Sequence, residues 1–196
     1  KQNNVKLFPA YYRRRLPKFL KVKELIDTKA IGEIKHVLIE LISAPREADL
    51  IKENLPWRVI PELSGGGYFM DMGSHQLDLL DYYFGEIIDV SSCVKNYSRL
   101  YPADDFVSAR FVTVSGVVIT GIWDFAAHPS QEKDLFKISG TKGTISFSSF
   151  GTDEITLETN NGINKYLESF PENVHFYLIE SVVKDLLGGM PSPSTG

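Results

Sequence analysis

Cysteine is nearly absent from this chain of 196 residues, in which Cys93 is the only one. A single cysteine excludes an internal disulfide, so nothing indicates a small disulfide-stapled scaffold. Cys93 lies in an apolar, strand-like run, where we expect it to be a small core residue. With 43% hydrophobic and 12% aromatic residues, the chain can fill one core, with or without an appendage.

A strong net charge is also lacking. The formal net charge is −4 and the sequence pI is about 5.6, which gives no electrostatic argument for nucleic acid or a membrane surface as a partner. The sequence shows no signal peptide, lipidation motif or long apolar run. We therefore expect a cytoplasmic protein. We also expect a chain cut at both ends, because it opens in polar sequence without methionine and stops in the loop-like run 190–196.

The chain has no strand–G-x-G-x-x-G–helix unit, which is the motif of a dinucleotide-binding Rossmann domain. Three consecutive glycines, at 65–67, precede a helical pattern, but without the spacing that a Rossmann turn requires. Internal repeats and low-complexity segments are missing too. A doubly wound parallel sheet is disfavoured on this ground, and because strand patterns follow one another from Ile87 to Leu167.

The most informative stretch covers residues 65–80. Its glycines permit a tight turn, and the apolar periodicity of residues 68–84 predicts a helix. Asp71, His75 and Asp78 stand at i, i+4 and i+7, on one face of that helix. Because histidine titrates near neutral pH, the spacing suggests a general acid/base at His75, oriented by the carboxylate of Asp71.

Other interpretations of this face remain open. The same side chains can form a solvated or structurally hydrogen-bonded face. Two carboxylates and an imidazole can also converge on a metal ion, but no second His/Cys cluster accompanies them, and we predict no metal site. A serine hydrolase is disfavoured because Ser74 does not lie in a G-x-S-x-G turn.

Upstream of this stretch the sequence predicts a strand or its remains at 5–12, a helix from Pro17 to 27, a buried strand at 33–43 and a long loop at 45–64. The basic triplet 13–15 is either a solvated face or an anion-binding group at the mouth of a site. In the loop, Trp57 and Arg58 could stack on and pair with a ligand. The alternative is that Trp57 only pins the loop to the surface.

Strands dominate the rest of the chain. We predict strands at 87–97, 106–114, 117–125, 134–139, 144–147, 155–158 and 163–167, and a last helix from 171 to about 187. Turn signals at Ser115-Gly116, 140–143 and 159–162 join consecutive strands as hairpins. The expected fold class is α+β: a large, mostly antiparallel sheet with two to three helices on one face.

The hairpin around Ser115-Gly116 suggests self-association. As a two-residue turn it pairs Val114 with Val117 and Val112 with Ile119. One face then carries Val112, Val114, Val117, Ile119, Trp123 and Phe125, and the other carries Val107, Ala109, Phe111, Val118 and Ile122. Helices can cover only one apolar face, so we expect a second copy of the chain to cover the other, with an exposed sheet as the alternative.

These motifs resemble a known family. The run Trp57-Arg58, the block from Ser64 through Gly65-Gly66-Gly67 to Asp71-x-Gly73-x-His75-x-x-Asp78, and Gly85 resemble the substrate domain of the glucose–fructose oxidoreductase and inositol dehydrogenase family (Gfo/Idh/MocA). The likeness continues through Tyr12-Arg13-Arg14, Leu25-Ile26 and 31–34 upstream and through 136–144 downstream, so it covers nearly the whole chain.

The resemblance implies that residues 1–196 are a single C-terminal substrate and oligomerisation domain. The parent protein would use NAD or NADP to oxidise a secondary alcohol of a sugar, polyol or related compound, or to run the reverse reaction. His75 matches the family's acid/base and Asp71 its carboxylate partner. We assign Asp78, Trp57 and Tyr12 to substrate binding, and Arg58 and Arg14 to cofactor binding. Relatives commonly associate through the sheet.

One departure from the family is large. Its third catalytic group, a lysine in a Glu-Lys-Pro motif, belongs to the Rossmann domain, and neither Lys1 nor Lys6 fits that motif. The resemblance therefore implies half of an active site, and we expect the chain alone to be inactive and to bind NAD(H) weakly. The alternative is a non-catalytic sugar-binding or scaffolding relative.

Overall fold

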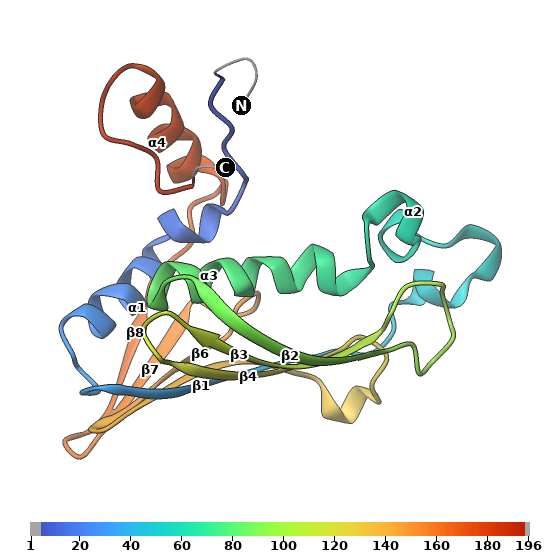
Figure 1. Ribbon diagram of the computed structural model, residues 1–196, viewed down its shortest axis with the longest axis horizontal. Helices are drawn as coiled ribbons and strands as arrows, with labels where there is room; N and C mark the ends of the chain where they lie inside the picture. The colour runs from blue at the N-terminus through green and yellow to red at the C-terminus, as the bar shows by residue number, and fades with distance from the viewer. Residues whose placement is uncertain (1–4, 195–196) are drawn as a thin grey trace.

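One eight-stranded sheet forms the base of the protein in this computed structural model, which describes residues 5–194 (Figure 1). The strands are β1 (Ile34–Ile42), β2 (Ile87–Lys95), β3 (Phe106–Thr113), β4 (Val118–Asp124), β5 (Lys133–Gly140), β6 (Gly143–Phe147), β7 (Glu154–Thr159) and β8 (Gly162–Leu167). Their order is β2-β3-β4-β1-β5-β6-β7-β8. All neighbours are antiparallel except β1 and β4, so the predicted mostly antiparallel sheet is confirmed.

The helices are α1 (Pro17–Asp27), α2 (Pro61–Ser64), α3 (Ser74–Phe84) and α4 (Phe176–Leu186). Both α1 and α3 cover the same face of the sheet (Figure 1). Proline at its first position starts α1, because the missing N–H would have no partner there. Phe19 of α1 and Leu79 of α3 are fully buried, and Tyr83 of α3 donates to the Phe19 carbonyl at 3.1 Å. The core therefore lies between these two helices and the sheet.

The segment before α1 differs from the prediction. Residues 5–11 form no strand, and η1 (Tyr12–Arg15) is a 3-10 turn. This segment runs beside α4, which stands away from the sheet, and Lys6 forms an ion pair with Asp185 of α4 (Figure 1). A short apolar run cannot become a strand unless a sheet edge lies within reach, and here it packs against helices.

The long segment 45–64 contains short helical turns and α2 rather than an irregular loop. Asp49 is fully buried and accepts hydrogen bonds from the Tyr68 hydroxyl at 2.8 Å and from the Arg46 backbone at 2.9 Å. Burial and this hydrogen bond raise the pKa of Tyr68 to about 12. The segment is therefore held against the start of the central helical stretch.

The predicted register of the β3–β4 hairpin is wrong by one residue. The structure pairs Val112 with Val118 and Phe111 with Ile119. The N–H of Thr113 donates to the carbonyl of Val117, which leaves a three-residue loop with its last residue, Gly116, at φ 81°. Such a loop carries one residue more than the expected turn, and a shift of one residue exchanges the two faces of a strand.

The exchange changes which side chains lie on the open face. The helix-covered face carries Val107, Ala109, Phe111, Ile119 and Trp123, all of them buried. On the open face, half-buried Leu38, Val112 and Ile122 alternate with polar residues such as Thr120 and Lys137. This face is therefore mixed in polarity rather than continuously apolar.

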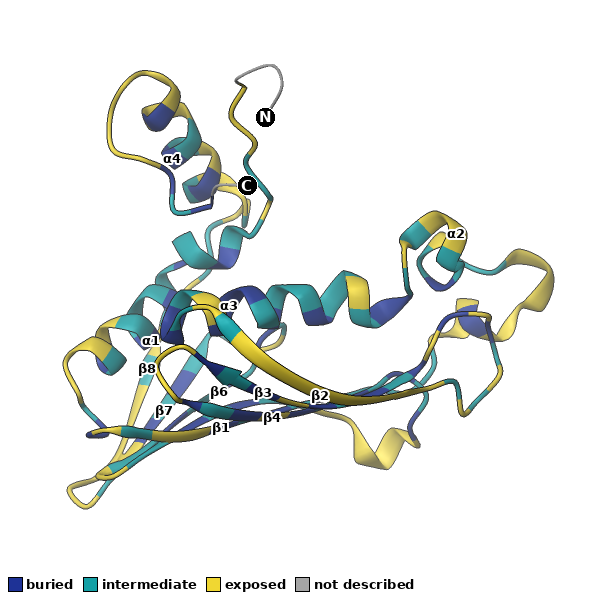
Figure 2. Ribbon diagram, in the orientation of Figure 1, coloured by how far each residue is buried: buried dark blue, intermediate teal, exposed yellow. Residues whose placement is uncertain are grey.

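The edge strand β2 is exposed along almost its whole length (Figure 2). Cys93 in this strand is exposed, so its predicted place in the core is wrong. Neither face of β2 is covered by a helix at that point, and its apolar residues Val90 and Val94 are 56% and 45% exposed. The sequence pattern of a core strand does not show that a strand lies at an edge.

Candidate functional site

The glycine run makes a tight turn just before the central helical stretch. Gly65 ends α2 at φ 83° and Gly67 has φ 84°, a region that glycine enters without steric penalty. The Ser64 hydroxyl accepts hydrogen bonds from the N–H groups of Gly66 and Gly67, at 3.3 and 3.0 Å. A Cβ on Gly67 would lie 2.6 Å from the Cβ of Ala103, so the close approach at this position requires glycine.

The predicted helix over 68–84 begins as a π-helical turn, η5 (Phe69–Gly73), and becomes regular only in α3. The Phe69 ring packs on Gly73, where a Cβ would lie 2.7 Å from it, and on Trp123 with centroids 5.0 Å apart. A π turn carries one residue more than an α turn and often occurs at functional sites. Asp71 and His75 therefore differ from ideal i, i+4 neighbours, and no hydrogen bond joins them in the structure.

Gln76 fixes the start of α3 to the rest of the molecule. Its side chain is fully buried, accepts a hydrogen bond from Trp123 Nε1 at 2.6 Å and donates to the hydroxyl of Ser149 at 2.8 Å. Trp123 lies in the centre of the sheet and Ser149 in the loop after β6. His75, the residue before Gln76, is therefore held in place by two separate elements.

A cavity of about 400 Å³ opens beside this helix start, within the size range of small-molecule sites. It is lined by Pro9, Ala10, Tyr11, Trp57, Ser64, Met70, Asp71, Ser74 and His75. Three predicted site residues, Trp57, Asp71 and His75, thus meet at one cavity, and Trp57 is 51% exposed there.

His75 is packed among aromatic rings. The centroids of Tyr11 and Tyr12 both lie 5.6 Å from its own, and that of Phe150 lies 6.5 Å away. Its Nδ1 is buried and has no hydrogen-bond partner among residues 5–194. Burial, followed by the positive charge of Arg13, lowers the pKa of His75 to about 4. The ring is therefore uncharged at neutral pH, which is the form that can accept a proton.

Asp71, the expected partner of His75, is hydrogen-bonded to Arg58 instead. Arg58 Nε lies 2.9 Å from Asp71 Oδ2, and both side chains are more than a third exposed. The guanidinium of Arg58 lies 4.7 Å from the centroid of the Trp57 ring. Asp71 still acts on His75 through space, because its negative charge opposes the lowering of the His75 pKa.

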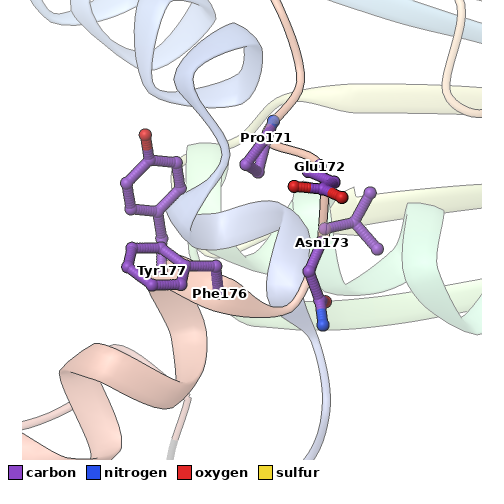
Figure 3. A pocket seen from close by; sticks show the side chains of 6 residues that line it. Pro171, Glu172, Asn173, Phe176 and Tyr177 are labelled. Carbon is purple, nitrogen blue, oxygen red and sulfur yellow. The ribbon is translucent and has the colours of Figure 1, made fainter.

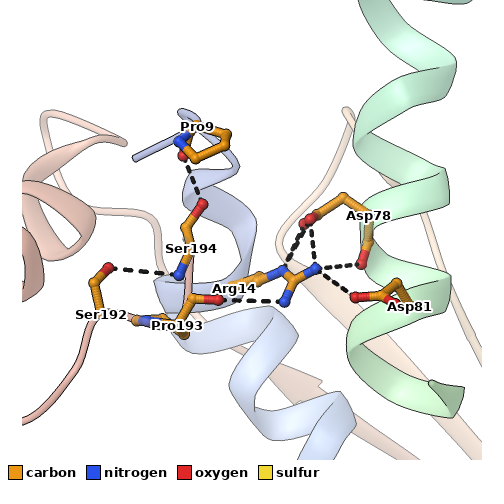
Figure 4. A network of polar contacts seen from close by, with 7 residues as sticks. All are labelled: Pro9, Arg14, Asp78, Asp81, Ser192, Pro193 and Ser194. Atoms are coloured by element: carbon orange, nitrogen blue, oxygen red, sulfur yellow. Dashed lines mark hydrogen bonds and ion pairs between the residues drawn. The ribbon is translucent and has the colours of Figure 1, made fainter. Parts of the chain in front are cut away.

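The other predicted site residues are not among those that line the cavity: Tyr12, Arg14, Arg58 and Asp78. Arg14 Nε donates to both carboxylate oxygens of Asp78, at 2.9 and 3.0 Å, and its Nη2 donates to Asp81 (Figure 4). Arg14 Nη1 donates to the carbonyl of Pro193, so the network joins η1, α3 and the C-terminal segment. The role of Asp78 in substrate binding and that of Arg14 in cofactor binding stay predictions. The Tyr12 ring contacts both His75 and His175, the latter at 4.6 Å.

A second and larger hollow, of about 700 Å³, lies at the start of α4 (Figure 3). It is lined by Pro171, Glu172, Asn173, Val174, Phe176 and Tyr177. One continuous segment supplies all of these residues, and they include no pair of an acid and a base. We therefore place the candidate site in the smaller cavity.

Metal ligands and membrane-spanning helices were looked for in the part of the chain that the structure describes. Between residues 5 and 194, no three or more His, Cys, Asp or Glu side chains gather in a way that could hold a metal ion. None of the helices in that range has the length and apolar character needed to cross a bilayer.

Sequence reasoning missed several residues around His75. Tyr11 and Met70 line the cavity, and both flank residues that the motifs had marked, so their position in sequence could have indicated them. Phe150 carries no such signal. Arg13 lies in the basic triplet that the sequence marks, between Tyr12 and Arg14, but its place near His75 was not predicted. Both come near His75 through folding that joins distant segments, which a single sequence does not show.

Comparison with known proteins relates the chain to one family and to an oxidoreductase. A family model described as "GFO/IDH/MocA C-terminal domain" matches residues 19–146. Oxidoreductase P35 of Formosa agariphila is 40% identical over 196 residues, which cover 98% of this chain and 59% of that protein. The chain thus spans less than two thirds of the length of this relative.

Solved structures agree on the fold. A crystal structure of an oxidoreductase from Thermotoga maritima matches with a TM-score of 0.75 and 27% identity, over 95% of this chain and 54% of that one. Levoglucosan dehydrogenase in complex with NADH and levoglucosan matches with a TM-score of 0.77 and 22% identity, over 94% of this chain and 58% of that one. An identity of 22% supports likeness of fold alone.

Proposed function

This chain belongs to the GFO/IDH/MocA family, and on that premise we propose that it is the substrate domain of a nicotinamide-dependent dehydrogenase. The relatives are oxidoreductases, which supports an enzyme as the longer parent protein. The observation that carries the proposal is the half-buried imidazole of His75, uncharged at neutral pH, at a small cavity beside Asp71. The proposed substrate is a secondary alcohol of a sugar, polyol or related compound.

In this proposal, His75 is the acid/base. Its Nε2 accepts the proton of the substrate hydroxyl, while the hydride leaves the same carbon and a carbonyl forms. A nicotinamide cofactor, NAD or NADP, supplies the hydride acceptor when it is bound. Asp71 stabilises the protonated imidazole through space, because its negative charge favours the cationic form. The reverse reaction uses the same groups in the opposite order.

The residues of this chain fit only a small part of such a cofactor. The cavity of about 400 Å³ suits a monosaccharide-sized molecule, and no glycine-rich phosphate-binding turn of the Rossmann type occurs in the chain. Arg58 and Arg14, the predicted cofactor contacts, are each paired with a carboxylate of the chain itself. We therefore assign most of the cofactor binding to a separate domain of the parent protein.

The cavity lining fits a sugar. Tyr11 and the half-exposed Trp57 offer aromatic faces to the C–H groups of a pyranose ring. Ser64, Asp71 and Ser74 add hydroxyl and carboxylate groups that can bind sugar hydroxyls. A protein of the same fold, levoglucosan dehydrogenase, has been solved in complex with NADH and levoglucosan.

A cytoplasmic location stays a prediction.

The test is a screen of the longer protein that contains this chain. Sugars and polyols are offered with NAD or NADP, and reduction of the nicotinamide is followed optically. We expect turnover with at least one secondary alcohol. The same screen on His75→Ala controls for reduction by other means, and absence of turnover with every alcohol and both cofactors would contradict the enzyme proposal.

One observation favours a non-catalytic, sugar-binding relative as a second candidate. Asp71 is hydrogen-bonded to Arg58, and no hydrogen bond links it to His75. The carboxylate and imidazole are therefore not assembled as a pair. Sugar binding to the longer protein in calorimetry, without nicotinamide reduction, would support this second candidate. The presence of a Glu-Lys-Pro lysine in the parent would argue against it.

A further inference from the structure

Arg13 is a buried cation without a carboxylate partner of its own. The residue is 5% exposed, and its Nε donates to the carbonyl of Ser149 at 3.1 Å. Its Nη1 is buried and has no hydrogen-bond partner within residues 5–194. The nearby carboxylate of Asp78 is already taken by Arg14. The carboxylates of Asp134 and Asp78 favour its charged form only through space. Burial of a cation without an ion-pair partner is unfavourable, so its place in the fold suggests a role.

Two aromatic rings fix the position of this guanidinium. Its central carbon lies 4.8 Å from the centroid of Tyr12 and 4.4 Å from that of Phe150. The same two rings pack on His75, with centroid distances of 5.6 and 6.5 Å. The guanidinium of Arg13 and the imidazole of His75 therefore pack on the same two aromatic rings, which hold both groups in one part of the site.

The loop that carries Phe150 is itself held firmly. The carboxylate of Asp134 accepts hydrogen bonds from the N–H groups of Ser149, Phe150 and Gly151, at 2.8, 2.7 and 3.2 Å. Gln76 bonds the Ser149 hydroxyl, which ties the same loop to the residue after His75. The position of Phe150 is thus fixed by hydrogen bonds within the protein itself.

We propose that Arg13 is a positioning residue for His75: the clamped guanidinium places a fixed positive charge beside the imidazole and keeps that ring uncharged, ready to accept a proton. The proposal rests on the proposed dehydrogenase function, in which an uncharged His75 is the form that accepts the hydroxyl proton.

Other charged and titratable groups face His75 as well. Asp71 of η5 favours the protonated ring, whereas His175, just before α4, opposes it. Tyr11 and Tyr12 pack on the ring from the N-terminal segment. After burial itself, Arg13 is the largest of the influences that lower the pKa of His75. Removal of its charge should therefore have a measurable effect on this pKa.

An NMR titration of the histidine ring nitrogens tests the proposal in the protein without substrate or cofactor. In the wild type, His75 should stay uncharged down to about pH 4. In Arg13→Gln its pKa should rise by about one unit or more, because a like charge has been removed. Arg13→Lys keeps the charge and should keep most of the lowering. Arg15→Gln is the matched control, since Arg15 is not among the groups that shift the His75 pKa.

A His75 pKa in Arg13→Gln equal to that in Arg15→Gln would overturn the proposal. If Arg13→Gln does not fold, the wild type still decides, because a His75 pKa at or above 6.5 would overturn the proposal without any variant. Neither substrate nor cofactor is present, so the titration succeeds or fails separately from the dehydrogenase screen.

Discussion

At the scale of residues, the lowered pKa of His75 predicts a dependence of stability on pH. Its ordinary pKa is 6.5 and its folded value is about 4, so between these values the unfolded chain binds a proton that the folded chain does not. Stability therefore falls as pH decreases through this window. After allowance for partial exposure of the ring, we expect a loss of about 1–2 kcal/mol from this group.

Urea unfolding at pH 6.5 and pH 4 measures this effect. His75→Gln should lose less stability than the wild type over the same interval, because it lacks the titrating ring. His36→Gln, at an exposed position on β1, is the control and should behave as the wild type does. Equal losses in the wild type and His75→Gln would contradict the predicted titration.

The site combines groups that the sequence marks with groups that it does not. His75, Asp71 and Trp57 were predictable because each stands in a motif, and all three line one cavity. Phe150 was not, because its approach to His75 depends on bringing α3 and the β6–β7 loop together. The hydrogen bond of Asp71 to Arg58 was also unforeseen, since spacing along a helix does not show a competing partner.

At the scale of elements, helix and strand identities were largely predictable and their details were not. The run of apolar and β-branched residues predicted β1 correctly, and the turn signal at 140–143 predicted the β5–β6 hairpin. The π turn η5 and the three-residue loop between β3 and β4 each add one residue to a regular pattern. Such additional residues depend on side-chain packing, for example that of Phe69 on Gly73. The periodicity of apolar residues does not show this packing.

The β6–β7 loop should depend on a buried lysine. Lys18 of α1 is fully buried, and its Nζ donates to the carbonyls of Ser148, at 2.6 Å, and Thr152. Burial lowers the pKa of Lys18 to about 8, so the amine is still largely charged at neutral pH. Lys18→Met removes the charged donor from both carbonyls and leaves that of Thr152 with only a 3.3 Å bond from the Ser148 hydroxyl. It should destabilise the protein by about 1–3 kcal/mol in chemical unfolding.

The matched control is Lys21→Met, on the same helix. Its side chain forms an exposed ion pair with Glu24, so its replacement should change stability by less than about 0.5 kcal/mol. Lys18→Met as stable as Lys21→Met would show that the loop does not need the lysine.

The glycine turn gives a second prediction at this scale. Gly65 and Gly67 both have φ near +83°, so alanine at either position is strained by about 1–2 kcal/mol. Only at Gly67 would the new Cβ also collide, at 2.6 Å from Ala103, whereas nothing lies within 4 Å of a Cβ at Gly65. Thermal unfolding should therefore show Gly67→Ala to be the less stable variant, by about 1–3 kcal/mol. The reverse order would contradict the described turn.

At the scale of the whole molecule, the open face of the sheet bears on assembly. Self-association through this face stays a prediction, although the face alternates apolar and polar residues rather than being continuously apolar. We expect light scattering at tens of micromolar to report a dimer or larger assembly. Ile122→Lys, in the middle of the open face, should return a monomer, whereas Glu62→Lys on α2 should not. A wild-type protein that is strictly monomeric would contradict this prediction.

The central claim is that His75 transfers the hydroxyl proton in the longer protein. The most direct measurement is kcat for nicotinamide reduction by that protein, compared between His75→Gln and His175→Gln. Each variant removes one imidazole. His75 lines the cavity, whereas His175 is exposed and contacts the Tyr12 ring without lining the cavity. We predict that His75→Gln lowers kcat by roughly 10²–10⁴-fold and that His175→Gln keeps it within a small factor of the wild type. A wild-type kcat in His75→Gln would contradict the claim.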